Sequence, residues 1–134
     1  MEAVNKTVVA VKGLVINNGK ILIVQRAMDD EVGGGTWEFP GGKIDFGEEL
    51  EVALVRGVKE ETCLRVSVEK LLYATSFKTD PRRQVVLLTY LCKCDSCKVI
   101  LSEEHSAYKW VTEEQMRVFL SPEILSDLER SGIK

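Results

Sequence analysis

One amphipathic helix, predicted over residues 48–62, is the feature that most constrains how this chain folds. Leu50, Leu54 and Val58 recur at four-residue steps, so they form a single apolar stripe that another element must cover. Strand-like segments lie on both sides of this helix along the chain. The pattern therefore predicts a mixed α+β or α/β fold, in which a sheet is packed between helices.

The strand-like segments are rich in β-branched residues and are separated by turn signals. Asn17-Asn18-Gly19 is a strong turn signal and predicts that the first two strands form a hairpin. Thr112 with Gln115 three residues later, and Ser121 followed by Pro122, predict the starts of two further helices. The predicted strands span residues 7–16, 20–25, 64–77, 84–94, 98–101 and 108–111.

Length and composition narrow the class of protein. A chain of 134 residues is about one domain, and no repeat or linker divides it, so we expect a single domain over residues 1–134. With 18 Lys and Arg against 21 Asp and Glu, the net charge of −3 lacks the basic footprint of a dedicated nucleic-acid binder. No apolar run approaches the ~20 residues that cross a bilayer, and residues 1–6 show no signal-peptide pattern. These features predict a cytoplasmic monomer or homodimer that binds neither membrane nor nucleic-acid polymer.

The chain has four cysteines, at positions 63, 92, 94 and 97. A chain of this size without a secretion signal needs no disulfides. Cys92, Cys94 and Cys97 are spaced closely enough to suggest zinc, with Cys63 or His105 as the fourth ligand. The spacing fits no complete zinc motif, so the sequence favours Cys92 and Cys94 on one face of a strand.

Residues 41–64 carry the strongest sign of chemistry. Gly41 and Gly42 precede Lys43, and a glycine-rich loop before a helix can present backbone N–H groups to an anion, although the Walker spacing is absent. Glu60 and Glu61 lie late in the predicted helix, where the helix dipole favours cations. Carboxylates suit Mg²⁺ or Mn²⁺, so these two residues indicate either a hard-cation site or a solvated acidic edge.

A longer pattern includes these residues. The segment from Gly42 to Leu64 resembles the Nudix box, G-x5-E-x7-R-E-U-x-E-E-x-G-U, where U is a bulky apolar residue. Seven of its nine specified positions match in register, at Gly42, Glu48, Arg56, Val58, Glu60, Glu61 and Leu64. Residues 25–27, 37–43 and 110–111 resemble the MutT-type branch of that family. The resemblance covers nearly the whole chain and implies the family's α/β/α sandwich with a mixed central sheet.

The resemblance implies a Mg²⁺- or Mn²⁺-dependent pyrophosphohydrolase that acts on a small-molecule nucleotide. Such an enzyme cleaves a nucleoside triphosphate, or a related nucleoside diphosphate compound, and releases a monophosphate. By position, Glu60 and Glu61 are implied as catalytic metal ligands, and Gly42 belongs to the same metal site. Glu103 and Glu104 precede the last predicted strand, where many family members place a further acidic residue. Glu104 is thus a further candidate ligand, although both residues also fit surface charges.

The remaining matched residues are implied to hold the site together and to bind substrate. Arg56 is implied as a catalytic-site residue that fixes the carboxylates through ion pairs, with Glu48 as its partner. Arg26 and Lys43 are implied to neutralise substrate phosphates, with Gly41 and Gly42 in the same binding loop.

Two positions depart from the box. Cys63 replaces a glycine that ends the helix, and Gly57 replaces a glutamate one turn before the paired glutamates. Gly57 removes a carboxylate from the metal face and costs up to ~1 kcal/mol of helix stability relative to alanine, with no packing gain evident in the sequence. The glycine at position 57 has three possible explanations. The site is impaired, the substitution is a chance change, or Glu48, Glu103 or Glu104 supplies the missing oxygen.

Three functions follow from these observations. Residues 37–43 favour a MutT-like hydrolase of nucleoside triphosphates. Gly57 favours the alternative of a catalytically impaired nucleotide-binding or regulatory domain. Hydrolysis of ADP-ribose or another nucleoside diphosphate compound is the third, because these substrates are selected by loops outside the box.

Overall fold

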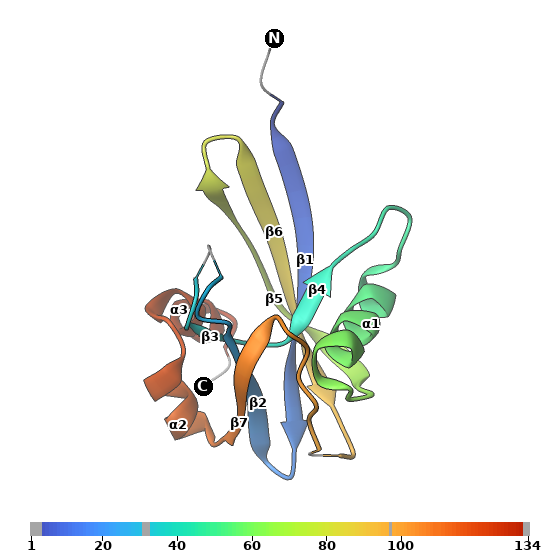
Figure 1. The fold of residues 1–134 in the computed structure, drawn as a ribbon, viewed down its shortest axis with the longest axis vertical. Coiled ribbons are helices and arrows are strands. Elements are labelled where there is room, and N and C mark those ends of the chain that lie inside the picture. The colour runs from blue at the N-terminus through green and yellow to red at the C-terminus, as the bar shows by residue number, and fades with distance from the viewer. Residues whose placement is uncertain (1–3, 31–32, 97, 133–134) are drawn as a thin grey trace.

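The computed structural model describes residues 4–30, 33–96 and 98–132. Its seven strands form one sheet, in which β3, β2, β1, β6 and β5 lie side by side while β4 pairs with β1 and β7 with β2 (Figure 1). β1 and β6 are parallel, and the other pairs are antiparallel, which confirms the predicted mixed sheet. The strands are β1 (Lys6–Asn17), β2 (Lys20–Arg26), β3 (Trp37–Glu38), β4 (Gly41–Lys43), β5 (Ser67–Asp80), β6 (Arg83–Lys93) and β7 (His105–Val111).

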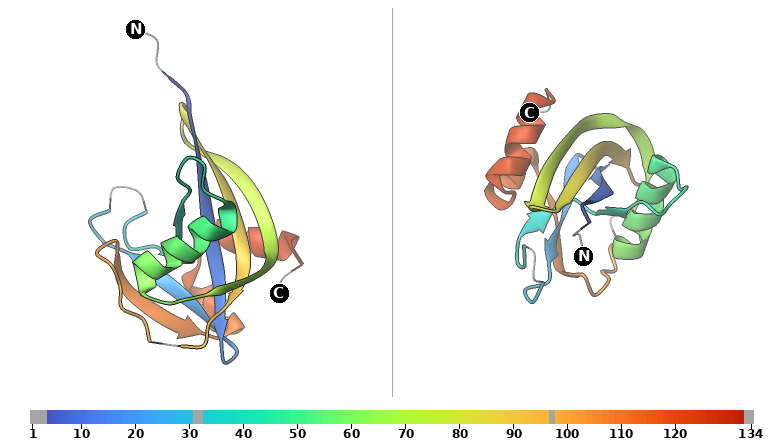
Figure 2. Two further views of the ribbon diagram at one scale, coloured as in Figure 1. Left: turned by 90° about the vertical axis from the view of Figure 1, so that its right-hand side faces the viewer. Right: turned by 90° about the horizontal axis from the view of Figure 1, so that it is seen from above.

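Helices cover both faces of the sheet. Helix α1 (Leu50–Thr62) lies on one face, and α2 (Glu113–Phe119) and α3 (Pro122–Arg130) lie on the other (Figure 2). The predicted α/β/α sandwich is therefore confirmed. None of the helices in the described residues has the length and apolar character needed to cross a membrane.

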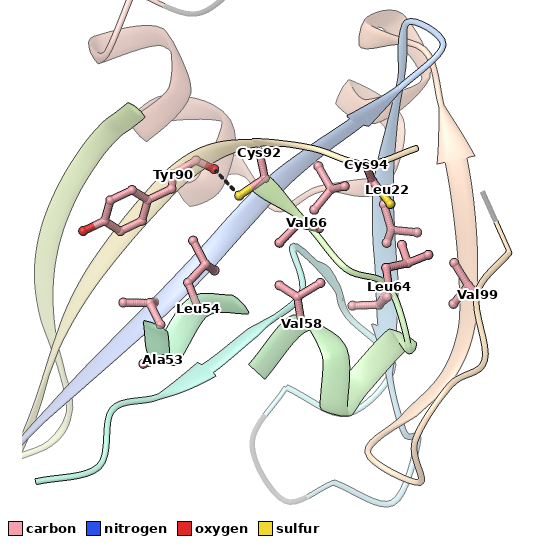
Figure 3. Packing of buried hydrophobic residues seen from close by; sticks show 13 residues of the cluster. Leu22, Ala53, Leu54, Val58, Leu64, Val66, Tyr90, Cys92, Cys94 and Val99 are labelled. Atoms are coloured by element: carbon pink, nitrogen blue, oxygen red, sulfur yellow. Dashed lines mark hydrogen bonds between the residues drawn. The ribbon is translucent and has the colours of Figure 1, made fainter. Parts of the chain in front are cut away.

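Alternation along β1 divides the core between the two helical layers. Val11 and Val15 pack in one buried cluster with α1. Figure 3 labels Leu54 and Val58 of the helix in this cluster. Leu14 points to the opposite face and joins the cluster beneath α2 and α3. Because successive side chains of a strand face opposite ways, β1 supplies both cores at once.

Local signals in the sequence set the ends of several elements. Asn18 and Gly19 both adopt positive φ angles, of 50° and 76°, as the predicted hairpin turn requires. Thr112 and Gln115 form the predicted capping box at the start of α2. The Ser121 side chain accepts a hydrogen bond from a backbone N–H at the start of α3.

The predicted strand over residues 98–101 is wrong. The N–H of Ile100 donates to the carbonyl of Thr62 at 3.0 Å, and the N–H of Ser102 donates to the carbonyl of Glu61 at 3.1 Å. This segment therefore pairs with the last turn of α1, whose terminal carbonyl groups have no partner within the helix. The loop predicted at residues 78–81 also shrinks, because β5 continues to Asp80.

The cysteines pack as apolar side chains. Cys92 and Cys94 are buried in the cluster beside α1 (Figure 3), and burial raises the pKa of Cys92 to about 12. Cys63 is exposed, and Cys97 lies outside the described residues. Within residues 4–30, 33–96 and 98–132, no three His, Cys, Asp or Glu side chains form a ready-made metal cluster.

Gly57 has a packing role that the sequence did not reveal. A Cβ atom at position 57 would lie 2.9 Å from the carbonyl carbon and oxygen of Gly41 and 3.0 Å from the nitrogen of Gly42. The backbones of α1 and β4 therefore touch directly, and only glycine fits this contact without displacing one of them. Cys63 takes the helix-ending position in the left-handed conformation, with φ of 63°.

We expect Gly57→Ala to destabilise the protein by about 1–3 kcal/mol, because the new methyl group overpacks against backbone. Helix propensity alone predicts the opposite sign, since alanine is the better helix former by up to ~1 kcal/mol. Chemical denaturation measures the difference, with the exposed α1 substitution Lys59→Ala as the control. A stabilised Gly57→Ala variant would contradict the contact. Gly57→Glu meets the same contact, so it is not expected to restore a working carboxylate.

Candidate active site

A cleft of about 920 Å³ is lined by residues of α1, β4, β1, β5 and β6. Among the residues predicted from the sequence, Glu48 and Glu103 are not part of its lining as the described residues define it. The predicted residues that do line it are Arg26, Gly41, Gly42, Lys43, Arg56, Glu60, Glu61 and Glu104. The structure thus brings together residues that are up to 78 positions apart in the sequence, from 26 to 104.

Arg56 joins α1 to the loop that follows β4. Its Nε and Nη2 atoms each donate to Glu48 at 2.9 Å, Nη1 donates to Glu60 at 3.0 Å, and Nη2 donates to the Lys43 carbonyl at 2.8 Å. The N–H of Asp45 also donates to Glu48 at 3.0 Å. The Arg56 hydrogen bonds lower the pKa of Glu48 to about 2. Both Glu48 oxygens are therefore engaged in the loop, which argues against Glu48 as the substitute for the missing carboxylate.

Glu61 is held inside the protein by Gly41, which with Gly42 belongs to strand β4; we call these two residues the glycine loop. It is 9% exposed, and its Oε1 atom accepts a hydrogen bond from the N–H of Gly41 at 2.9 Å. Burial raises its pKa to about 7, although the Lys12 charge and the Gly41 hydrogen bond oppose that rise. A carboxylate removed from water in this way gains from a bound cation, which compensates the charge that solvent no longer stabilises.

The cleft offers oxygen donors suited to a hard cation. Glu60 and Glu61 come from α1 and Glu104 from the segment before β7, and Gly42 of β4 lines the same cleft. Mg²⁺ is usually held by one or two carboxylates together with waters and substrate phosphates, so it needs no complete protein cage. The incomplete set of ligands in this cleft therefore fits Mg²⁺ or Mn²⁺.

Sequence reasoning missed a second charged group in the cleft, centred on Glu38 of β3. Its carboxylate contacts Nε2 of His105 at 2.9 Å, Nη1 of Arg26 at 3.3 Å and Nζ of Lys12 at 3.5 Å. Burial opposes ionisation of Glu38, but Lys12, the His105 hydrogen bond and Arg26 outweigh it and lower the pKa to about 2. Two signals were available, since Lys12 is the only charged residue in the apolar run 7–16 and His105 is the only histidine.

Arg26 occupies the predicted phosphate-binding region but bonds mainly to carboxylates. Its Nη2 atom donates to Asp30 at 2.6 Å, and Nη1 donates to both oxygens of Glu38 at 3.3 Å. Burial opposes the charged form, but Glu38 and Asp30 outweigh it and raise the pKa of Arg26. The guanidinium is therefore held in place by two anionic neighbours.

Apolar side chains line the middle of the cleft, between the charged end and Thr79, Asp80 and Arg83 at the β5–β6 hairpin. Val8 and Ala10 of β1 pair with Val85 and Leu87 of β6, and Val85 pairs with Phe77 of β5. All five side chains line the cleft, and Phe77 is 47% exposed. We call these five residues the apolar strip. Figure 1 shows that the strands β1, β5 and β6, which carry the strip, extend beyond the helices at one end of the sheet.

Known proteins share this architecture and sequence. A family model of the NUDIX domain matches residues 6–129. A MutT-like protein of Streptomyces ambofaciens is 34% identical over 109 residues, which span 81% of this chain and 66% of that relative. CTP pyrophosphohydrolase of Escherichia coli K12 is 31% identical over 126 residues, spanning 92% of this chain and 90% of that protein. The crystal structure of a MutT protein from Methanosarcina mazei Go1 matches with a TM-score of 0.86 at 25% identity, covering 98% of this chain and 96% of that one.

Together these features define a class of hydrolases that act on phosphate compounds. The features are the sandwich fold, the glutamates on α1 and the glycine loop. The chain belongs to the Nudix hydrolase family, and it is a MutT-like member of it. Nudix hydrolases act on small nucleotide substrates and generally need a divalent cation.

We expect Glu61→Gln to stabilise the metal-free protein at pH 8. The pKa of Glu61 is higher in the folded protein than in the unfolded chain, so its ionisation destabilises the fold as pH rises from about 4.5 to 7, and the full cost remains above that range. Removing the charge should recover on the order of 1–3 kcal/mol at pH 8 and almost nothing at pH 4.

Denaturant unfolding in the presence of a chelator tests this expectation. Glu60→Gln is the matched control, because Glu60 is exposed and its substitution should change stability by no more than about 0.5 kcal/mol. A Glu61→Gln variant that is no more stable than the wild type at pH 8 would contradict the buried, uncompensated carboxylate.

The Nε and Nη2 atoms of Arg56 both donate to Glu48, and this pair of hydrogen bonds, which we call the Arg56 fork, gives a second expectation. A double-mutant cycle between Arg56→Lys and Glu48→Gln should show stronger coupling than a cycle between Arg56→Lys and Asp45→Asn, since Asp45 lies 3.8 Å away and is 80% exposed. Because the pKa of Glu48 is lowered, its contribution is present above about pH 4.5 and is lost as pH falls toward 2. Equal coupling in the two cycles would contradict the fork.

Proposed function

We propose that this protein is a Mg²⁺-dependent MutT-like pyrophosphohydrolase, with Mn²⁺ as a substitute, that cleaves a nucleoside triphosphate to a monophosphate and pyrophosphate. The observation that carries the proposal is one continuous cleft, which joins the buried carboxylate of Glu61 and the glycine loop to the apolar strip. A nucleotide has the same division, with charged phosphates at one end and a base with an apolar ring face at the other. In this proposal residues 1–134 act as a single hydrolase domain.

The cation ligands in this proposal are oxygen atoms of the box. Glu60 and Glu61 would hold the cation, with Gly42 as a further ligand. When bound, Mg²⁺ would offset the charge of the phosphates and would help to orient a water molecule for in-line attack. Arg56 fixes the direction of Glu60 through the hydrogen bond described above, so it acts as a positioning residue.

Proton transfer from the attacking water needs a carboxylate that is not already occupied. Among the cleft carboxylates of the described residues, Glu104 is the one without a side-chain hydrogen bond or ion pair, whereas Glu38, Glu60 and Glu61 each have at least one. Glu104 is therefore our proposed substitute for the box carboxylate that Gly57 lacks.

Substrate binding divides along the cleft. Lys43 faces the phosphates where Gly41 and Gly42 line the cleft, and Arg26 reinforces the positive charge at that end. The base and sugar lie against the apolar strip, where Phe77 offers an exposed ring for stacking. The names of the relatives support nucleoside triphosphates, because one is a CTP pyrophosphohydrolase and others are nucleoside triphosphatases.

Incubation with a panel of ribo- and deoxyribonucleoside triphosphates and Mg²⁺ tests the proposal. We expect release of pyrophosphate from at least one triphosphate, with loss of activity in a chelator and in Glu61→Gln. Glu104→Gln should lower kcat more than it raises KM. Pyrophosphate release from none of the triphosphates would overturn the proposal.

The same incubation, extended to ADP-ribose and to measurements of nucleotide binding, distinguishes the two alternative functions from hydrolysis of triphosphates. Tight nucleotide binding without turnover would favour an impaired or regulatory domain, which Gly57 supports. Release of a nucleoside monophosphate from ADP-ribose, with triphosphates untouched, would favour a hydrolase of other nucleoside diphosphate compounds. The cytoplasmic location and the monomeric or dimeric state remain predictions from the sequence.

A further inference from the structure

Lys12 lies where the apolar strip meets the charged end of the cleft. It shares a face of β1 with Ala10 and Leu14, since side chains alternate along a strand. Leu14 is buried beneath α2 and α3, whereas Ala10 belongs to the apolar strip. Lys12 is thus the first residue at which this face of the sheet emerges from the core into the cleft. On the neighbouring strand its backbone pairs with Gly41 of the glycine loop.

The positive charge of the Lys12 ammonium group is only partly compensated by neighbouring negative charges. Its side chain is 19% exposed, and its one ion pair among the described residues is the 3.5 Å contact with Glu38. Glu38 is shared with Arg26 and His105, so it does not serve Lys12 alone. The charge of Lys12 also acts on the nearby carboxylate of Glu61. An ammonium group has three donors, so Lys12 retains capacity for another acceptor.

A cation bound to Glu60 and Glu61 would change the balance of charge around Lys12. Once Glu61 is neutralised by a cation, Lys12 loses part of its compensation and keeps a positive charge beside the cleft. A phosphate group brings the anionic oxygens that such a charge needs. Arg26 is less available for this task, because both of its terminal nitrogens already donate to carboxylates and one of those contacts is only 2.6 Å.

We propose that Lys12 binds the phosphate group attached directly to the nucleoside. This inference rests on the proposed function of the cleft. Two residues of β-strand span about 7 Å, so Lys12 lies one such step beyond Ala10 toward the glutamates. With the base and sugar on the apolar strip, the first phosphate meets Lys12, and the phosphates beyond it meet the cation, while Lys43 lies beside Ala10.

Separate titrations of the two products test this assignment, in the presence of Mg²⁺. The probes are the ribo- and deoxyribonucleoside monophosphates and, separately, inorganic pyrophosphate, with binding measured by calorimetry. Lys12→Met should weaken binding of the preferred monophosphate by roughly tenfold or more, because a charge-assisted contact is lost, while pyrophosphate binding stays within about threefold. Lys12→Arg, which keeps the charge, should retain most of the monophosphate affinity.

Lys6→Met is the matched control, since Lys6 is an exposed lysine of the same strand outside the cleft lining. Should Lys12→Met fold poorly because Glu38 loses a partner, the Lys12→Met/Glu38→Gln double variant removes both charges, and Glu38→Gln alone is its reference. The double variant should then show the same selective loss of monophosphate binding.

Unchanged monophosphate affinity in a folded Lys12→Met variant would overturn the inference. Weaker binding of Mn²⁺ alone, measured by electron paramagnetic resonance, would also overturn it, because Lys12 would then act through the carboxylates. We expect Mn²⁺ binding to be unchanged or tighter, since a neighbouring positive charge has been removed. A wild-type protein that binds neither probe would instead overturn the proposed function, whatever the behaviour of Lys12.

Discussion

The direct contact between the backbones of α1 and β4 is the constraint on which the rest of the site depends. Gly57 lies against Gly41 and Gly42 without an intervening side chain, so the helix lies close against the glycine loop. This closeness lets the Glu61 carboxylate reach the Gly41 N–H, and it lets Arg56 bond across to the Lys43 carbonyl. The residue that removes a carboxylate from the box thus also sets the geometry of those that remain.

Two buried glutamates in one cleft have opposite protonation behaviour. Glu38 is held ionised by Lys12, His105 and Arg26, so it acts as a fixed anchor for cationic side chains. Glu61 has fewer compensating neighbours, and burial leaves its pKa near 7. The pKa values of the two glutamates differ because their surroundings differ. Desolvation raises the pKa of a carboxylate and neighbouring positive charges lower it, and the balance of these two effects is different at the two positions. The weakly compensated carboxylate is the one in the position of a metal ligand.

The sequence could predict what short-range patterns encode. The Asn17-Asn18-Gly19 hairpin, the Thr112 capping box and the amphipathic α1 all appear as predicted, because each depends on residues within one turn or one strand pair. The segment over 98–101 was misassigned because its partner is the end of α1 rather than another strand. Sequence analysis also missed the Glu38 cluster and the packing role of Gly57, because both arise from contacts between segments that are distant in the sequence.

The two hydrogen bonds from Ile100 and Ser102 to the last turn of α1 have a consequence for how such proteins diversify. They fix the segment that carries Glu104 and His105 relative to Glu61, whatever the length of chain between the helix and that segment. The outer end of the intervening β5–β6 hairpin, toward which Phe77 lies, is therefore free to lengthen, shorten or change its side chains. Substrate preference can then evolve in the hairpin while the catalytic end of the cleft keeps its geometry.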